Sequence, residues 1–270
     1  MPAIDLARLR KQANRLADFF FLPDDFLKHL RETLDFYVNR TMRRAENIAP
    51  GSNLPTYRTP AVVIRQIENA IGSIAMQNPH FALELADRLW DEGYIETRLL
   101  AAFLLGRIPP QEERLLARLT AWTQQVRDPS VRAALLTTSL SRMRKETPKE
   151  FLVLVGEWLH PARQRLWSNG LQALIPLIVD PDFENLPPVF EIVQPVLEAA
   201  PGALQTDIAA LILALYQDSP NETTFFLHEI LKTSPNPLTA ITLRRILPSL
   251  PPPLQASLRE LVRPPKKEER

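Results

Sequence analysis

The sequence of 270 residues predicts an all-α protein built from short helices. Proline is abundant, with 26 residues, whereas only 7 glycines occur. No long alternation of polar and apolar residues indicates a β-strand. Six prolines directly follow a residue whose side chain can cap a helix, an order typical of helix starts. These pairs are Thr59-Pro60, Asn78-Pro79, Asp128-Pro129, Thr147-Pro148, Ser219-Pro220 and Ser234-Pro235.

Apolar residues spaced by three and four predict the helices in order. The first two are expected over residues 3–21 and 24–44, and Pro50, Gly51 and Pro55 then interrupt helix formation in a loop over residues 46–58. The remaining helices are expected near residues 60–76, 79–92, 94–107, 110–126, 129–145, 148–159, 162–179, 188–199, 202–217, 220–233, 237–247 and 252–263.

Two of these segments are apolar around the whole helix. Residues 99–105 contain no polar side chain, and residues 208–215 read IAALILAL. Such a helix must be covered on every side, as is the inner helix of a stacked helical repeat. Every second predicted helix is weakly similar to the others at a period of about 33 to 41 residues, which is in the range of HEAT repeats.

The predicted fold is therefore an α-solenoid of about six to seven HEAT-like helix pairs in a right-handed superhelix. We expect a single repeat domain over residues 1–263 and a charged tail over residues 264–270. A compact helical bundle is the alternative, because its core helices can also be apolar.

Composition excludes several classes of function. The net charge is +1, so no global field marks the chain as a nucleic-acid or membrane binder. The absence of cysteine excludes disulfides and thiolate metal sites, and the four histidines form no metal-binding spacing. We expect no metal, no nucleotide cofactor and no membrane segment. The amino terminus lacks an apolar signal core, which indicates a cytoplasmic protein.

Residues 82–108, ALELADRLWDEGYIETRLLAAFLLGRI, resemble the opening repeats of the HEAT-like DNA alkylation repair family. The similarity includes Leu89-Trp90, the acidic turn with its glycine, and Glu96 and Arg98 before an alanine-rich helix. The resemblance implies a curved superhelix that binds duplex DNA on a basic concave face. It also implies a possible activity, the removal of alkylated purines by a DNA glycosylase, in which a carboxylate stabilises the developing oxocarbenium ion.

The catalytic positions of that family are poorly matched. In residues 126–136 Asp128 opens the helix, but Pro129 stands where the family has an aromatic residue. In residues 163–174 Arg165 falls near an expected aromatic position and Trp167 lies two residues late. The resemblance therefore implies DNA binding more directly than catalysis.

Individual residues allow two interpretations. Asp128 is a weak catalytic candidate, but an N-cap before Pro129 explains an aspartate at this position completely. Trp122, Trp158 and Trp167 suit either a groove that contacts nucleotides or the helical core.

Charge is unevenly distributed along the chain. Residues 122–170 contain eight Lys or Arg against four acids, whereas residues 180–236 contain one lysine against nine acids. A phosphate backbone would suit the basic middle. The DNA-binding candidates are Arg127, Arg132, Arg163, Arg165, Lys149, Trp122, Trp158 and Trp167. A HEAT-like scaffold that binds a protein partner, without nucleic acid, is the alternative function.

Overall fold

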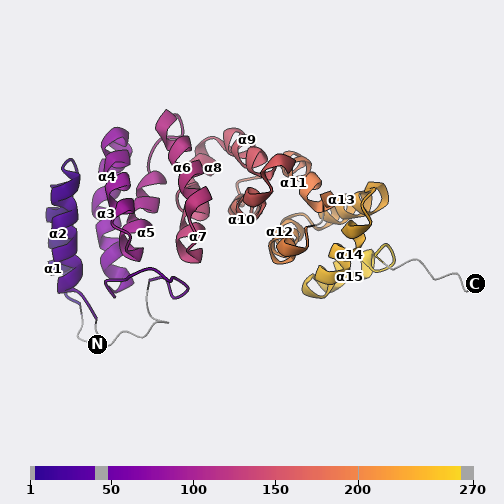
Figure 1. Ribbon diagram of the computed structural model, residues 1–270, viewed down its shortest axis with the longest axis horizontal. Helices are drawn as coiled ribbons and strands as arrows, with labels where there is room; N and C mark the ends of the chain where they lie inside the picture. The colour runs from indigo at the N-terminus through magenta and orange to yellow at the C-terminus, as the bar shows by residue number, and fades with distance from the viewer. Residues whose placement is uncertain (1–3, 40–47, 200, 263–270) are drawn as a thin grey trace, which may run out of the picture. The chain divides into compact units, whose positions relative to one another are not determined.

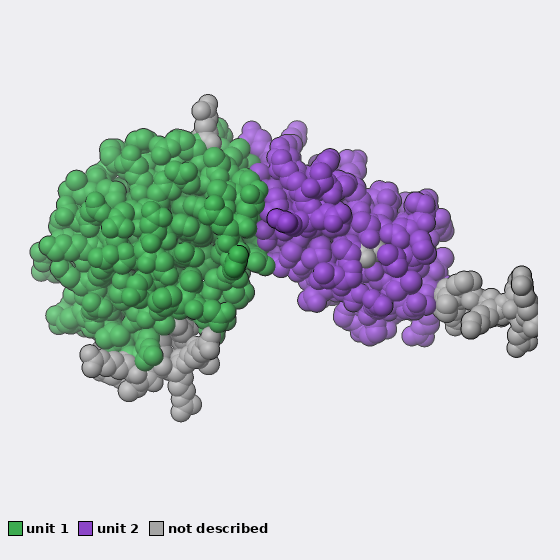
Figure 2. Space-filling view, viewed as in Figure 1, with its two compact units in different colours: residues 1–148 green, residues 149–270 purple. Residues whose placement is uncertain are grey.

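In the computed structural model, residues 4–39, 48–199 and 201–262 are described, and every regular element in these ranges is helical (Figure 1). This confirms the all-α prediction. None of the helices in these ranges combines the length and the hydropathy of a membrane-crossing segment. The chain divides into two compact units, residues 1–148 and 149–270, which Figure 2 distinguishes by colour. The single repeat domain stays a prediction, and the tail over residues 264–270 lies outside the described residues.

Unit 1 contains eight α-helices within its described residues. They are α1 (Leu6–Ala17), α2 (Pro23–Phe36), α3 (Ala61–Gln77), α4 (Pro79–Asp91), α5 (Ile95–Leu105), α6 (Glu113–Gln125), α7 (Pro129–Thr137) and α8 (Ser141–Glu146).

Unit 2 begins with α9 (Pro148–Leu159), whose first residue is the last of unit 1. It continues with the 3₁₀-helix η2 (Pro161–Leu166), α10 (Trp167–Ile178), α11 (Pro187–Ala199), η3 (Gly202–Leu204), α12 (Gln205–Asp218), α13 (Pro220–Thr233), α14 (Pro237–Ile246), η4 (Leu247–Ser249) and α15 (Pro252–Leu258).

The helices of unit 1 pack in two layers. Helix α3 contacts both α1 and α5, and α5 contacts α7, so these four helices form one layer, which we call the odd layer. Helix α2 contacts α4, and side chains join α4 to α6, so these three form the even layer. Consecutive helices pair across the layers, most extensively α4 with α5. The same alternation occurs in unit 2, where α12 contacts α10 and α14, and α13 contacts α11 and α15.

Helix α5 explains why residues 99–105 are apolar throughout. It packs against α3, α4 and α7, and Leu100, Leu104 and Leu105 are fully buried. Ala101 and Ala102 are also fully buried, and the small side chain of Ala102 leaves room for Ser139 to donate a hydrogen bond to its carbonyl at 2.8 Å. Helix α12 is covered less completely, because Ala210 is exposed. The prediction of an enclosed helix is thus confirmed for most of α5, whereas Arg98 and Leu99 are half-buried.

Most predicted helices differ from the structure by a few residues at their ends, and three differ more substantially. Helix α2 ends at Phe36, because the chain then turns so that Asn39 N–H bonds to the carbonyl of Arg58 at 3.0 Å. The predicted helix over residues 129–145 is two helices, α7 and α8, which are separated by three residues. The predicted helix over residues 162–179 begins as η2, in which Arg163 has non-helical backbone angles, and becomes α-helical at Trp167.

The cap-and-proline prediction is confirmed for some helix starts and wrong for others. Helices do begin at the prolines of four of the six pairs. Of the predicted caps, Asp128 makes the side-chain bonds, whereas Asn78 and Ser219 make none. Helix α3 begins after Pro60, and α14 begins at Pro237 with Asn236 as its cap. Thr59 instead bonds to Leu34 of α2 at 3.4 Å, so a tertiary contact replaces the local one.

Candidate functional site

The segment from Ala49 to Thr59, which we call the strap, crosses the amino-terminal ends of α5 and α7. At α7, the carboxylate of Asp128 accepts hydrogen bonds from Ser52 Oγ at 2.9 Å and from Asn53 N–H at 2.8 Å. Its other oxygen accepts from the N–H groups of Ser130 and Val131, both at 3.1 Å. One side chain therefore caps α7 and fixes the strap to it.

At α5 the strap is held by a second carboxylate. Thr56 Oγ donates to Glu96 Oε1 at 2.7 Å, and the carbonyl of Pro55 accepts from Ile95 N–H at 3.0 Å. Glu96 is fully buried, and its second oxygen has no hydrogen-bond partner among the described residues. Three residues of chain span at most about 10 Å, so the step from Asn53 to Thr56 brings the first turns of α5 and α7 close together.

A third carboxylate, that of Glu92, anchors the strap beyond α4. Arg31 of α2 binds it with two hydrogen bonds, at 2.7 and 2.5 Å, and Tyr57 of the strap approaches it at 3.4 Å. The bonds from Arg31 lower the pKa of Glu92 despite partial burial. Burial and the nearby Glu92 raise the pKa of Tyr57 to about 12, so this phenol stays protonated. Tyr57 also stacks on Tyr94 with ring centroids 4.3 Å apart.

Asp128, the weak catalytic candidate, has a structural role in this arrangement. Burial raises its pKa, but the hydrogen bonds from Asn53, Val131, Ser52 and Ser130 outweigh burial and lower it. With both oxygens occupied by two donors each, the carboxylate is an N-cap and a clamp for the strap. A catalytic role for Asp128 stays a prediction that this hydrogen-bonding pattern does not support.

A cluster of tryptophan and arginine side chains lies where α4 and α6 end, which we call the Trp–Arg cluster. Trp90 and Trp122 stack face to face, with centroids 4.1 Å apart and an interplanar angle of 6°. The guanidinium of Arg98 lies over Trp90 at 4.8 Å. Arg132 donates to the carbonyl of Val126, one turn beyond Trp122, at 3.3 Å. The tryptophans are only 8% and 6% exposed, whereas both arginines are half-buried.

The other predicted DNA-binding residues belong to unit 2, apart from Arg127, which is exposed just before α7. Lys149, Arg163 and Arg165 are exposed, and Arg163 lies 3.4 Å from Glu157. Trp158 and Trp167 are buried at 1% and 3% exposure. DNA contact by these residues stays a prediction. The burial of Trp122, Trp158 and Trp167 places all three rings in the core of their units.

Charge in unit 1 separates according to layer. The odd layer contains seven basic residues and two acids, whereas the even layer contains five basic residues and eight acids. The basic residues of the odd layer are Arg8, Arg10, Lys11, Arg15, Arg65, Arg98 and Arg132, and its acids are Glu68 and Glu96. The odd layer is therefore the more positive of the two layers, while α8, which belongs to neither, adds three basic residues and one acid.

The two layers also differ in how their arginines are paired. In the even layer, Arg88 bonds to Asp24 at 2.6 Å, and Arg118 bonds to Asp87 through two bonds at 2.6 and 2.8 Å. In the described part of the chain, none of the seven basic residues of the odd layer forms an ion pair with a carboxylate. Positive charge on the odd layer is thus left for solvent or a partner to neutralise.

Within the ranges that the structure describes, no three His, Asp or Glu side chains gather in a way that suits a metal ion. The site therefore has the chemistry of a binding surface: guanidinium groups, helix starts and stacked rings. The candidate functional site of unit 1 consists of the odd layer and the Trp–Arg cluster beside it.

Comparison with known proteins indicates that this all-α chain is of a DNA-repair class. The family model described as DNA alkylation repair enzyme matches residues 38–245. The chain belongs to this family. Searches of curated proteins and of solved structures found no match.

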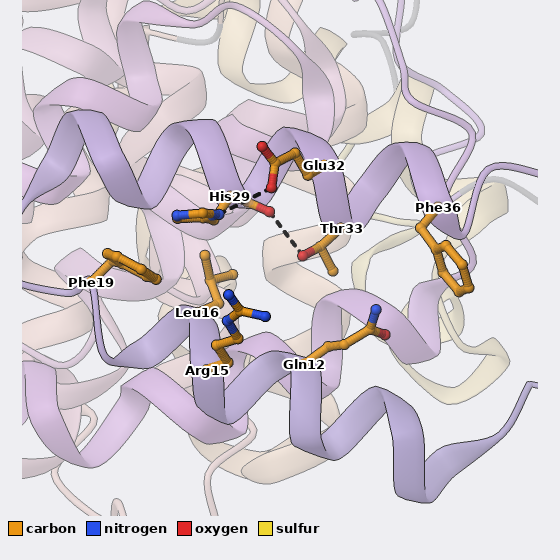
Figure 3. A pocket seen from close by; sticks show the side chains of 8 residues that line it. All are labelled: Gln12, Arg15, Leu16, Phe19, His29, Glu32, Thr33 and Phe36. Atoms are coloured by element: carbon orange, nitrogen blue, oxygen red, sulfur yellow. Dashed lines mark hydrogen bonds and ion pairs between the residues drawn. The ribbon is translucent and has the colours of Figure 1, made fainter.

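A pocket between α1 and α2 precedes the matched residues (Figure 3). Its cavity measures about 210 Å³, and Arg15 and His29 extend toward the space between the two helices. Phe19 and Phe36 lie at its opposite ends, and His29 is bound to Glu32 at 3.0 Å. His29 is already bound to Glu32, and the pocket lies outside the residues that match the family, so we do not include it in the candidate site.

Sequence reasoning included Arg132 and Trp122 but missed their partners, Arg98 and Trp90, as site residues. Both appear in the segment that carries the family resemblance, and Arg98 is the fourth residue of α5 just as Arg132 is the fourth of α7. A comparison of successive inner helices position by position would have found this pair. The separation of charge by layer was also missed, because counting charges along the sequence averages over both layers.

Proposed function

We propose that the protein binds duplex DNA through the basic odd layer of unit 1, as a DNA-repair protein of the cytoplasm. As part of this proposal, the helix pairs are HEAT-like repeats of a right-handed α-solenoid, about six to seven in number. Arg127 and Arg132 would contact phosphates in unit 1, and Lys149, Arg163 and Arg165 would contact phosphates in unit 2.

The main support for this proposal is that arginines of the even layer form ion pairs with carboxylates, whereas the basic residues of the odd layer form none among the described residues. Surface arginines are usually close to carboxylates in a chain of nearly zero net charge, and the even layer follows this rule. The odd layer does not, although α1 alone contains four basic residues and no acid. An unpaired row of cations over adjacent helices suits a polyanion with regularly spaced charges, and family membership indicates that this polyanion is DNA.

Removal of alkylated bases is a separate step that the binding proposal does not require. Asp128 is occupied by four donors, and Glu96 is buried beneath the strap. Incubation of alkylated DNA with the protein, followed by detection of free base, measures that activity directly. Release of base with wild-type protein and with an Asp128→Asn variant would identify a glycosylase that does not depend on Asp128.

The test of the proposal is a titration of labelled duplex DNA with the full-length protein at about 50 mM salt, repeated at increasing salt. We expect binding at low salt and a linear fall of log K with log salt, with a slope of about −0.9 for each phosphate contacted. No detectable binding at about 50 mM salt would refute the proposed function and would favour a scaffold that binds protein.

A further inference from the structure

Two donors of the Trp–Arg cluster have no hydrogen-bond acceptor. The Nε atoms of Arg98 and Arg132 are both buried, and neither has a partner among the described residues. An arginine remains charged in a protein, and a buried N–H of a charged group without an acceptor destabilises the folded state. Two unsatisfied donors at matching positions among the described residues leave room for an acceptor that a bound anion supplies.

The two arginines occupy matching places on neighbouring helices. Each is the fourth residue of its helix, and the strap holds the first turns of α5 and α7 together through Glu96 and Asp128. Further along, Gly106 at the end of α5 lies directly against the backbone of Thr138, which follows α7. Contact at both ends keeps α5 beside α7, so we expect matching positions of the two helices to lie on the same side of the layer.

The stacked tryptophans hold these guanidinium groups in place. The guanidinium carbon of Arg98 lies 4.8 Å from the ring centroid of Trp90, which itself stacks on Trp122. Arg132 donates a hydrogen bond to the carbonyl of Val126 at the end of the same helix as Trp122. Stacking fixes the plane of a guanidinium and leaves its edge N–H groups available, the arrangement that suits bidentate binding of an oxyanion. Both arginines are half-buried as whole residues, although their Nε atoms are buried, so a ligand would approach the exposed part of each side chain.

We propose that Arg98 and Arg132 together form a binding site for one phosphate oxyanion, with Trp90 and Trp122 as its rigid base. Asp128 accepts from four donors, and Glu96 accepts from Thr56 with one oxygen, while its second oxygen has no partner among the described residues. This inference deepens the proposed function, on which its assignment to a DNA phosphate rests, because it names the residues that hold one phosphate of the backbone.

The experiment compares wild-type protein with Arg98→Lys and Arg132→Lys variants, which keep the charge but lose the planar fork. Arg114→Lys, at an exposed position of α6, is the matched control. Inorganic phosphate and duplex DNA are titrated separately, and binding is followed by the fluorescence of the tryptophans and by the shift in melting temperature. Circular dichroism confirms that each variant remains folded.

We expect phosphate to change the fluorescence and to raise the melting temperature of the wild type and of Arg114→Lys. Either cluster variant should weaken phosphate binding at least tenfold and reduce the salt slope for DNA by about one contact. A wild type without any response to phosphate, or cluster variants that bind phosphate and DNA as the wild type does, would overturn the site. If the wild type binds phosphate through both arginines but does not bind DNA, the oxyanion site stands and the proposed function fails.

Discussion

A Gly106→Ala substitution is expected to destabilise unit 1 by about 3 kcal/mol, because it forces apart two backbones in contact. A Cβ atom at this position would lie only 2.2 Å from the carbonyl oxygen of Thr138 and 3.3 Å from Ser141 Oγ. Close contacts between carbon and oxygen are normally about 3.3 Å or longer. A backbone carbonyl cannot rotate away as a side chain can, so α5 and the α7–α8 turn would have to separate.

The measurement is urea unfolding of the Gly106→Ala variant, followed by circular dichroism. Gly156→Ala is the matched control, since a Cβ there would meet only a methyl group of Ile192 at 3.5 Å, an ordinary contact within helix α9. The control should be neutral or more stable by up to about 1 kcal/mol, because alanine favours a helix interior. Equal stabilities of the two variants would show that α5 and Thr138 are not in close contact.

The second large effect is expected at Asp128. An Asp128→Ala substitution removes the cap of α7 and leaves Ser52 and Asn53 without their acceptor, for a loss of about 3 kcal/mol. Ser52→Ala removes one of the four donors and should cost about 1 kcal/mol. Urea unfolding of both variants measures this difference. A loss below about 1 kcal/mol for Asp128→Ala would contradict the role of Asp128 as a clamp.

The same carboxylate makes stability depend on pH in a defined direction. Its pKa in the folded protein lies below the ordinary value of 3.8, so the folded state favours the ionised form. Its contribution is complete above pH 3.8 and is lost as the pH falls through the lowered folded value. Stability of the wild type should therefore fall more than that of Asp128→Ala when unfolding is compared between pH 6 and pH 3.

The sequence predicted much of the fold from local chemistry. Proline after a polar residue located the starts of α4, α7, α9 and α13, and an apolar run located the enclosed helix α5. The break between α7 and α8 could not be predicted, since it depends on contact between Gly106 and Thr138, which are far apart in the sequence. The start of α10 was missed for a similar reason: the indole of Trp167 bonds to the carbonyl of His160 at 3.1 Å and stabilises a turn before the helix.

The candidate site was predicted less completely than the fold. Asp128 was found together with both of its interpretations, because a cap is visible in the sequence, but the strap that binds it comes from about 75 residues earlier in the chain. To pair Arg98 with Arg132, one must know that α5 contacts α7. The charge of a layer can be counted only after each helix has been assigned to a layer. Both depend on tertiary structure, which cannot be derived by counting charges along the sequence.

The central claim, that the odd layer of unit 1 binds the DNA backbone, is tested most directly by reversing charge on one layer at a time. Arg10→Glu with Arg65→Glu changes two exposed residues of the odd layer, and Lys28→Glu with Arg114→Glu makes the same change in net charge on the even layer. Affinity for duplex DNA is measured for both double variants at about 50 mM salt. We predict a loss of about 100-fold for the odd-layer variant and less than about threefold for the even-layer variant. Equal losses, or a larger loss for the even-layer variant, would contradict the account.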